Sequence, residues 1–239
     1  MRLPHPYRPE WACVDCPRRH DRTFCDVPDA PMRAFDAVKY SLLYPAGEIL
    51  FVEGEEPSGV FLVCSGRVQV FSTSSEGRQQ IVQLAGDGDL LGVSSVLGGK
   101  HHAATAQALE PSHLKFVKAA DFVALARHWP EISFGVARLV CLAADDAMER
   151  ARALGPSGPA AARVARFLLE RCERDGRPDP QGVRVSLGLT HEQIGQVIGV
   201  SRETVSRTLS RFRREDLILL GRSTVLVRDK VALEEMAVV

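Results

Sequence analysis

The spacing of hydrophobic positions changes along the chain, and the change separates two kinds of structure. Between residues 40 and 118, short runs rich in Val, Leu, Ile and Phe alternate with turns that contain glycine. Strands that follow one another about every ten residues are typical of a β-barrel or jelly roll. We therefore predict a β-roll built from the strands Glu48–Val52, Gly59–Cys64, Arg67–Thr73, Gln79–Leu84, Leu90–Gly92, Ala104–Leu109 and His113–Val117.

Beyond this region the apolar positions take up helical spacing. A short helix is expected at Asp121–Arg127 and a long one at Glu131–Ala153. The long helix carries an apolar stripe with steps of four, three, four and four residues, the spacing of a coiled-coil seam. We predict that this stripe joins two copies of the chain, with packing against the chain's own β-roll as the alternative. The stripe consists of Ile132, Val136, Leu139, Ala143 and Ala147.

The C-terminal part of the chain follows a linker at Gly155–Pro159. Residues 160–174 have the pattern of an amphipathic helix, and Arg177–Pro180 is expected to be a loop. One strand is expected before Thr190 and a two-stranded wing after Arg214; the three strands are Val183–Leu187, Leu217–Leu220 and Thr224–Val227.

Two short helices joined by a tight turn are predicted between Thr190 and Arg214. Thr190 is expected to cap the first helix together with Gln193, three residues later. Gly199 lies where this helix must end and turn, and Ser201 can cap the next helix. With the flanking strands, this order predicts a winged helix-turn-helix, whose second helix enters the major groove of DNA.

The outward side of this second helix carries residue types that read base edges. Glu203, Ser206 and Arg207 share one face because they are spaced i, i+3 and i+4. Arg can donate two hydrogen bonds to guanine O6 and N7, and a carboxylate can accept one from cytosine N4. Ser can form a hydrogen bond with a base edge or a phosphate. The alternative is a solvated surface helix. We predict DNA contacts from Thr190, Ser201, Arg202, Glu203, Thr204, Ser206, Arg207 and Arg211.

Because the chain has no net positive charge, any affinity for DNA must come from a local patch of basic residues. The chain has 239 residues, of which 45% are hydrophobic, and its formal net charge is zero. Between Thr190 and Arg214, however, five Arg stand against two Glu, which gives the local positive field that attracts phosphates.

No signal-peptide core or membrane-spanning run occurs, so a cytoplasmic protein is expected. No G-x-S-x-G or H-E-x-x-H motif occurs, so no enzyme is expected.

Cysteines gather near the N-terminus. Cys13, Cys16 and Cys25 are three of the six cysteines of the chain. A C-x2-C pair places two thiolates on one metal or cluster, and a third nearby cysteine completes most of a site. The alternatives are a zinc site with His20 as the fourth ligand, or three unrelated thiols.

The order of these parts resembles that of the CRP/FNR superfamily of bacterial transcription regulators. The motifs that carry the resemblance are Tyr44–Gly47, Phe51–Gly54, Ser65–Val68, Gly88–Gly92, Thr190–Gly195 and Ser201–Arg207. The resemblance implies an α+β fold in which a β-roll of the cyclic-nucleotide-binding type precedes a long dimerisation helix and a winged helix-turn-helix. It divides the chain into a leader (1–30), a β-roll sensor domain (31–128), a dimerisation helix (129–155) and a DNA-binding domain (156–239).

The resemblance also bears on the ligand. In the cyclic-AMP-binding branch, the segment after Gly-Asp carries Gly-Glu and later an Arg that holds the cyclic phosphate. Here Gly92 is followed by Val93, and the stretch Lys100–Thr105 contains no Arg. A buried phosphate without its Arg is poorly compensated, so no cyclic AMP is expected. Lys100, His101 or His102 could hold another anion.

The chain is similar instead to the FNR branch. The pattern Glu203-x-x-Ser206-Arg207 implies palindromic sites with TTGAT-like half-sites. The oxygen-sensing members of this branch hold a [4Fe–4S] cluster through three N-terminal cysteines and one in the roll.

Cys13, Cys16 and Cys25 are similar to the first three of these ligands. Lys115 occupies the position of the family's internal cysteine, so we take Cys64 as the fourth ligand, with a small buried hydrophobic residue as the alternative. The remaining cysteines, Cys141 and Cys172, are expected to be packing residues.

These features together predict a homodimeric, DNA-binding transcription regulator that senses oxygen, redox state or nitric oxide through the cluster. We expect an intact cluster to order the leader and favour the dimer. RNA polymerase is an implied partner, and a membrane is not. The alternative is a regulator without a cluster that responds to heme or another small ligand, or is constitutively active, with its cysteines binding zinc or unused.

Overall fold

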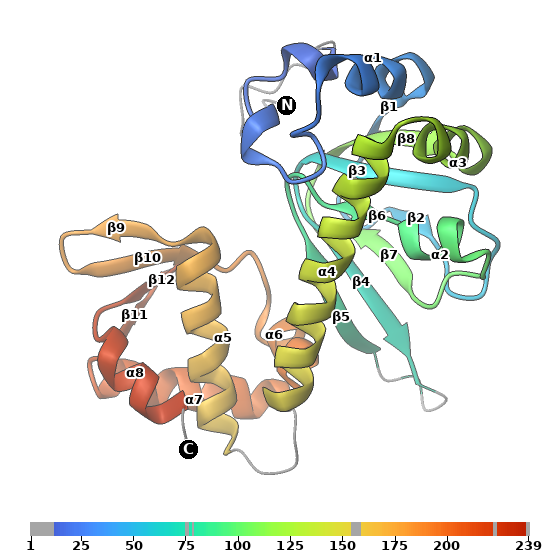
Figure 1. The fold of residues 1–239 in the computed structure, drawn as a ribbon. Coiled ribbons are helices and arrows are strands. Elements are labelled where there is room, and N and C mark those ends of the chain that lie inside the picture. The colour runs from blue at the N-terminus through green and yellow to red at the C-terminus, as the bar shows by residue number, and fades with distance from the viewer. Residues whose placement is uncertain (1–11, 75–76, 78, 154–158, 222–223, 238–239) are drawn as a thin grey trace. The chain divides into compact units, whose positions relative to one another are not determined.

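The computed structural model describes residues 12–74, 77, 79–153, 159–221 and 224–237. The chain forms two compact units, Met1–Asp146 and Ala147–Val239, and helix α4 (Pro130–Ala153) runs across their boundary. Figure 1 shows the elements of each unit. Of the linker expected at Gly155–Pro159, the first four residues lie outside the described part. Within the described ranges, no helix combines the length and apolar character needed to cross a lipid bilayer.

The first unit contains the expected jelly roll, formed by two four-stranded antiparallel sheets (Figure 1). One sheet has the strand order β1-β8-β3-β6 and the other β2-β7-β4-β5. The strands are β1 (Tyr40–Tyr44), β2 (Ile49–Phe51), β3 (Gly59–Ser65), β4 (Val68–Thr73), β5 (Gln79–Ala85), β6 (Leu90–Leu91), β7 (Thr105–Ala108) and β8 (Ser112–Lys118).

Strand β3 is buried on both faces along its whole length. Because successive side chains of a strand point to opposite faces, β3 contributes to two cores. Phe61 and Val63 fill the interior of the roll. Val60, Leu62 and Cys64 belong to a second core on the other face of the sheet. This alternation places Cys64 outside the roll interior.

The second core is made by helices and by the leader segment, which we define as residues 12–28. Helices α1 (Asp29–Val38), α3 (Ala119–His128) and the first half of α4 contribute to it. Phe24 of the leader segment has no exposed surface. Its ring centroid lies 5.4 Å from that of Phe35 and 6.4 Å from that of Phe122. The leader segment is therefore part of the folded unit, held by its own apolar side chains.

Helix α4 packs one side against this second core. Ile132 and Val136 are buried there, and Leu139 packs against it partly exposed. The prediction that this stripe forms an intermolecular seam is therefore wrong for Ile132 and Val136, which are covered by their own chain. The alternative, packing against the chain's own β-roll unit, holds for this part of the helix.

The opposite side of α4 carries a different apolar stripe. Phe134, Cys141 and Met148 recur every seven residues, and Phe134 is 68% exposed and Met148 52% exposed. Cys141 is exposed in the single chain as well, so the packing role expected for it is not filled by a core of its own chain. Ala137 and Ala144 lie between these residues at heptad spacing. We call these five residues the outer stripe.

The second unit contains the expected winged helix-turn-helix. Its sheet has the order β11-β12-β10-β9, and its core includes Phe167, Ile194, Phe212 and the buried Cys172, which confirms Cys172 as a packing residue. The elements are α5 (Ala160–Asp175), β9 (Arg177–Asp179), β10 (Gly182–Ser186), α6 (His191–Ile198), α7 (Arg202–Arg214), β11 (Ile218–Leu220), β12 (Thr224–Val227) and α8 (Lys230–Ala237).

Some elements differ from the sequence-based expectation. Strand β9 forms where a loop was expected: it pairs with β10 at the edge of the sheet, a position that tolerates Pro178 because an edge strand has one unpaired side. Helices α1, α2 (Val93–Gly98) and α8, and strand β1, have no counterpart among the predicted elements.

The burial of Phe24 predicts that the leader segment stabilises the first unit. Phe24→Ala should lower the free energy of unfolding of this unit by about 3–5 kcal/mol, because it leaves a cavity among aromatic side chains. Trp129 packs against the second core, and the sequence after residue 146 contains no tryptophan, so urea unfolding followed by tryptophan fluorescence reports on the first unit. Leu43→Ala, at an exposed position of β1, should change the value by at most about 0.5 kcal/mol. Equal effects of the two substitutions would contradict the packing role of Phe24.

Candidate DNA-binding surface and thiol site

The helix-turn-helix is fixed by its capping residues. The Thr190 hydroxyl accepts from the Gln193 backbone N–H at 3.2 Å, and the Gln193 side chain accepts from the Thr190 N–H at 2.8 Å. This reciprocal pair is the predicted capping box. Gly199 ends α6 with a φ of 68°, in the left-handed region that favours glycine. Ser201 caps α7 by accepting from the Thr204 N–H at 3.3 Å.

The backbone of the turn also approaches helix α6 closely. A Cβ at Gly195 would lie 2.5 Å from the Val200 carbonyl oxygen, so only glycine fits at this position of α6. Val205, Leu209 and Phe212 of α7 are buried in the core of the unit. The other side of α7 therefore faces solvent, and a shallow depression on it is lined by Arg202, Glu203, Ser206, Arg207 and Ser210.

Two of these side chains are oriented by neighbours. Hydrogen bonds from its own backbone N–H and from the Ser201 hydroxyl hold the pKa of the Glu203 carboxyl below its ordinary value, so this group is an acceptor at neutral pH. The Ser206 hydroxyl lies 2.7 Å from Nδ1 of His191, the first residue of α6. His191 was absent from the predicted set; its position next to the N-cap Thr190 was the available signal.

The remaining arginines of α7 differ in their surroundings. Arg213 and Arg214 are exposed. Arg211 is half-buried, with its Nε 3.7 Å from a carboxylate oxygen of Glu215 and its guanidinium 5.4 Å from the centroid of the Phe212 ring. The last turn of α7 therefore presents cations beside the polar face that could read bases.

The three leader cysteines and Cys64 belong to one region of the first unit, which we call the thiol site. Cys13, Cys25 and Cys64 are buried, and Cys16 is half-buried. Burial, and after it the Asp36 carboxyl and the Cys64 thiol, raises the pKa of Cys13. Burial, followed by Cys64, raises the pKa of Cys25 to about 12, and Cys16 contributes as well. Each buried leader thiol thus interacts electrostatically with Cys64.

Basic side chains surround these thiols. Arg22 is buried and donates from Nη2 to the Cys64 carbonyl oxygen at 2.6 Å, and together with Arg19 it opposes the rise in the pKa of Cys25. Lys115 is fully buried on β8 and donates from Nζ to the Ser41 hydroxyl at 2.7 Å. Burial lowers the pKa of Lys115, and the Cys64 thiol opposes that shift.

The residues of the thiol site fit a group that needs four thiolate ligands. Three buried thiols and one half-buried thiol are unfavourable as isolated anions, and a bound cationic group together with nearby guanidinium groups supplies the missing charge. Ligands of an iron–sulfur cluster bind different iron atoms, so they need not converge as the ligands of a single ion do. In the part of the chain described, no three His, Cys, Asp or Glu side chains are grouped so as to hold a single metal ion.

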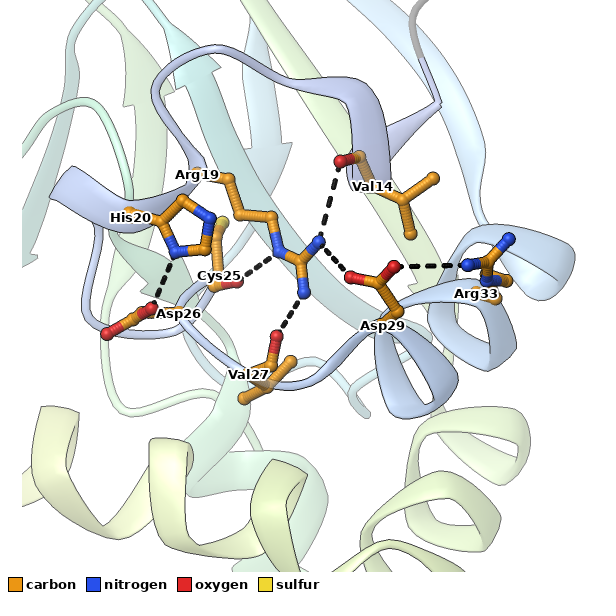
Figure 2. Close-up of polar contacts among 8 residues, drawn as sticks. All are labelled: Val14, Arg19, His20, Cys25, Asp26, Val27, Asp29 and Arg33. Carbon is orange, nitrogen blue, oxygen red and sulfur yellow. Dashed lines mark hydrogen bonds and ion pairs between the residues drawn. The ribbon is translucent and has the colours of Figure 1, made fainter.

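His20 is not placed as the fourth ligand of a zinc site. Its side chain is 77% exposed, and its Nδ1 lies 2.9 Å from Oδ1 of Asp26 (Figure 2). This arrangement gives no support to the alternative of a zinc site in which His20 is the fourth ligand.

The residues expected to offer an anion site in the roll, Lys100, His101 and His102, do not form one positively charged group. His102 is buried and stacks on the Phe51 ring, with the centroids 3.9 Å apart and an interplanar angle of 12°. Burial lowers the pKa of His102, which favours the neutral ring. A neutral, stacked imidazole is a poor counter-charge for an anion. Lys100 and His101 are exposed.

The fold and surface described above define a two-part regulator with a jelly-roll unit and a winged helix-turn-helix. Residues 42–128 match the family "Cyclic nucleotide-binding domain", and residues 162–236 match the family "Crp-like helix-turn-helix domain". The chain belongs to the CRP/FNR superfamily of DNA-binding transcription regulators.

Individual relatives are similar over most of their length. The cyclic AMP receptor protein of Thermus thermophilus is 33% identical over 195 residues, which cover 82% of this chain and 87% of that protein. The transcriptional activator protein Anr of Pseudomonas protegens is 28% identical over 191 residues, covering 80% and 78%. The structure of FixK2 from Bradyrhizobium japonicum superposes with a TM-score of 0.74 at 26% identity, covering 83% of this chain and 97% of that chain.

Proposed function

We propose that this regulator is a homodimer that senses oxygen, redox state or nitric oxide through a [4Fe–4S] cluster held by Cys13, Cys16, Cys25 and Cys64. When bound, such a cluster supplies a group that oxygen or nitric oxide can attack. The observation that carries the proposal is the placement of Cys64 on the outer face of β3, in the same core as Cys13 and Cys25.

The choice of Cys64 over a purely structural role rests on its neighbours. A buried cysteine usually behaves as a small hydrophobic residue. Cys64, however, perturbs two other thiols and is approached by the basic residues Arg22 and Lys115. Lys115 occupies the position expected for the family's internal cysteine, and its ammonium group can counter the charge of thiolates. Cys172, which lacks these neighbours among the described residues, provides a natural comparison.

The proposed signal passes from the thiol site to α4 within one core. A Cβ at Gly135 would lie 3.8 Å from Cδ2 of Phe24 and from Cγ1 of Val27, so the leader segment packs directly on this helix. Phe24 precedes Cys25 in the chain. A change in the backbone at Cys25 therefore acts on the helix that carries the outer stripe. The leader segment packs through its own side chains, so we no longer expect a cluster to be needed to order it.

The proposed dimer uses the outer stripe of α4 in place of the stripe expected from the sequence. In a parallel pair of helices, residues at one heptad position meet their copies across the twofold axis. Phe134, Cys141 and Met148 occupy one such position, with Ala137 and Ala144 at the other. Their exposed apolar surface in a single chain is explained if a second copy covers it.

On DNA, we propose that Glu203, Ser206 and Arg207 read base edges of palindromic TTGAT-like half-sites. Thr190, Ser201, Arg202, Thr204 and Arg211 support this contact. The argument is the polar face of α7, which is turned away from the core of the second unit. RNA polymerase is the further partner that this type of regulator implies.

A second candidate signal is a cyclic nucleotide, because one relative is named a cyclic AMP receptor protein and residues 42–128 match a cyclic-nucleotide-binding family. The stacked, neutral His102 and the lack of Arg between residues 92 and 105 argue against it. Titration of the purified chain with cyclic AMP, followed by calorimetry, separates the two. Saturable micromolar binding that increases affinity for DNA would favour the cyclic nucleotide.

Iron content tests the cluster. Protein purified without oxygen should contain about four iron atoms per chain and show the broad visible absorption of an iron–sulfur cluster. Cys64→Ser should lose most of the iron, because a thiolate ligand is removed, whereas Cys172→Ser, at a buried position of the other unit, should retain it. Equal retention in both variants would exclude Cys64 as a ligand, and a sharp Soret band would indicate heme.

Cross-linking tests the dimer. Under mild copper-catalysed oxidation, most chains should become disulfide-linked through Cys141, because its heptad position brings two copies together. Cys141→Ser should abolish the link. In that background, Ala143→Cys introduces a thiol at another exposed position, on the opposite side of the helix, and should stay unlinked. Efficient linking of the Ala143→Cys variant, with none through Cys141 in the unsubstituted chain, would show that the outer stripe is not the interface.

Binding to matched and mismatched half-sites tests base reading. Glu203→Ala should reduce discrimination at one base pair by about 1–3 kcal/mol. Arg213→Ala should weaken binding to all sequences alike and reduce the slope of log affinity against log salt by about 1. Fluorescence anisotropy at several salt concentrations measures both. Equal losses for Glu203→Ala on all half-sites would remove this residue from base readout.

A further inference from the structure

One guanidinium group lies at the centre of the leader segment. Arg19 begins the 3₁₀ turn η2 (Arg19–Asp21), and only 4% of it is exposed. Figure 2 shows its side chain enclosed by the backbone of the segment to which it belongs. Its Nε donates to the Cys25 carbonyl oxygen at 3.2 Å, its Nη1 to that of Val14 at 3.4 Å, and its Nη2 to that of Val27.

A carboxylate balances the charge of this buried group. Nη1 of Arg19 also donates to Oδ1 of Asp29, at 2.7 Å, and the other oxygen of Asp29 accepts from Arg33 at 3.0 Å. The bond from Arg19 holds the pKa of the Asp29 carboxyl below its ordinary value. Asp29 is itself largely exposed, so the pair requires only the guanidinium to lose its water. The rigid fork of donors on Arg suits several fixed acceptors at once, which a Lys ammonium cannot match.

The accepting carbonyl groups belong to both ends of the cysteine loop. Val14 follows Cys13 directly, and Cys25 offers its own carbonyl. Arg19 therefore closes the stretch between the two buried cysteines through hydrogen bonds. Closing a flexible loop of this length costs conformational entropy, and these bonds offset that cost whether or not a metal group is present.

We propose that Arg19 is a positioning residue that holds Cys13 and Cys25 in a preformed loop before any metal group binds. The inference rests on the proposed function only in taking these cysteines as ligands. Arg22 has a different role, because it joins the leader segment to β3 through the Cys64 carbonyl. The preformed loop allows the thiols to be emptied and refilled without refolding of the segment.

Thiol alkylation in the full chain, stripped of metal with a chelator, tests the loop directly. Iodoacetamide modification is followed at each cysteine by mass spectrometry. Cys141, which is exposed, should react fastest, and Cys13 and Cys25 should be protected. Arg19→Gln should speed the reaction of Cys13 and Cys25 by about 100-fold, because it leaves buried carbonyl groups without donors. Removing a nearby cation disfavours the reactive thiolate, so such acceleration reports opening of the loop.

Two matched variants distinguish the donor geometry of the Arg19 guanidinium from its positive charge. Arg33→Gln removes an exposed arginine of the same network and should change both rates by less than about 2-fold. Arg19→Lys keeps the charge but not the fork, so it should release the loop as Arg19→Gln does. Full protection in Arg19→Lys would overturn the role of the fork, and unchanged protection in Arg19→Gln would overturn the proposal.

A milder variant covers the case in which Arg19→Gln unfolds the whole first unit. Asp29→Asn removes the carboxylate that fixes Nη1 and should speed the reaction of both cysteines by about 10-fold, with unchanged circular dichroism. No acceleration in Asp29→Asn would then count against the proposal. Iron binding by the unsubstituted chain is measured separately: its absence would overturn the cluster but would leave the alkylation result intact.

Discussion

The burial of β3 on both faces is the constraint on which the first unit depends. A strand in the middle of a roll normally needs apolar side chains on one face only, with water on the other. Here Val60 and Leu62 are as fully buried as Val63, so something must cover the outer face. The helices and the leader segment provide that cover. Cys64 therefore lies between the roll and this covering layer, in one core with residues of the leader segment and of α4.

The same layer links the thiols with the helix proposed to dimerise. Phe24 and Val27 pack beside Gly135, while the outer stripe faces away from them on the same helix. A bound group can shift an equilibrium only by the difference in its interactions with the two states. In the proposed mechanism, that difference arises in the packing of the leader segment on α4. A separate pathway between distant sites is not required.

Much of the architecture could be predicted from the spacing of apolar residues. Which face of α4 packs against its own chain could not be predicted in this way. Strand alternation and the caps at Thr190 and Ser201 are local properties, so the sequence displays them. An apolar stripe at helical period shows that a face is covered, yet it does not say by what. Ile132 faces the chain's own core and Phe134 faces outward, although both are large and apolar. Cys64 could be proposed as a ligand because it ends a predicted strand. The thiols and basic side chains around it are distant in the sequence, so only the folded structure identifies them.

The folded leader segment also reduces the free energy that the proposed cluster would have to supply on binding. Had the segment been disordered without metal, binding would have to offset the entropy of ordering it, about 1–2 kcal/mol per residue for the backbone alone. Phe24 in the core and the Arg19 hydrogen bonds already provide that order. In the proposed mechanism, the free energy of cluster binding is then available for shifting the packing of α4. A preformed site is thus compatible with a switch, because coupling requires two arrangements of packed residues and not an unfolded one.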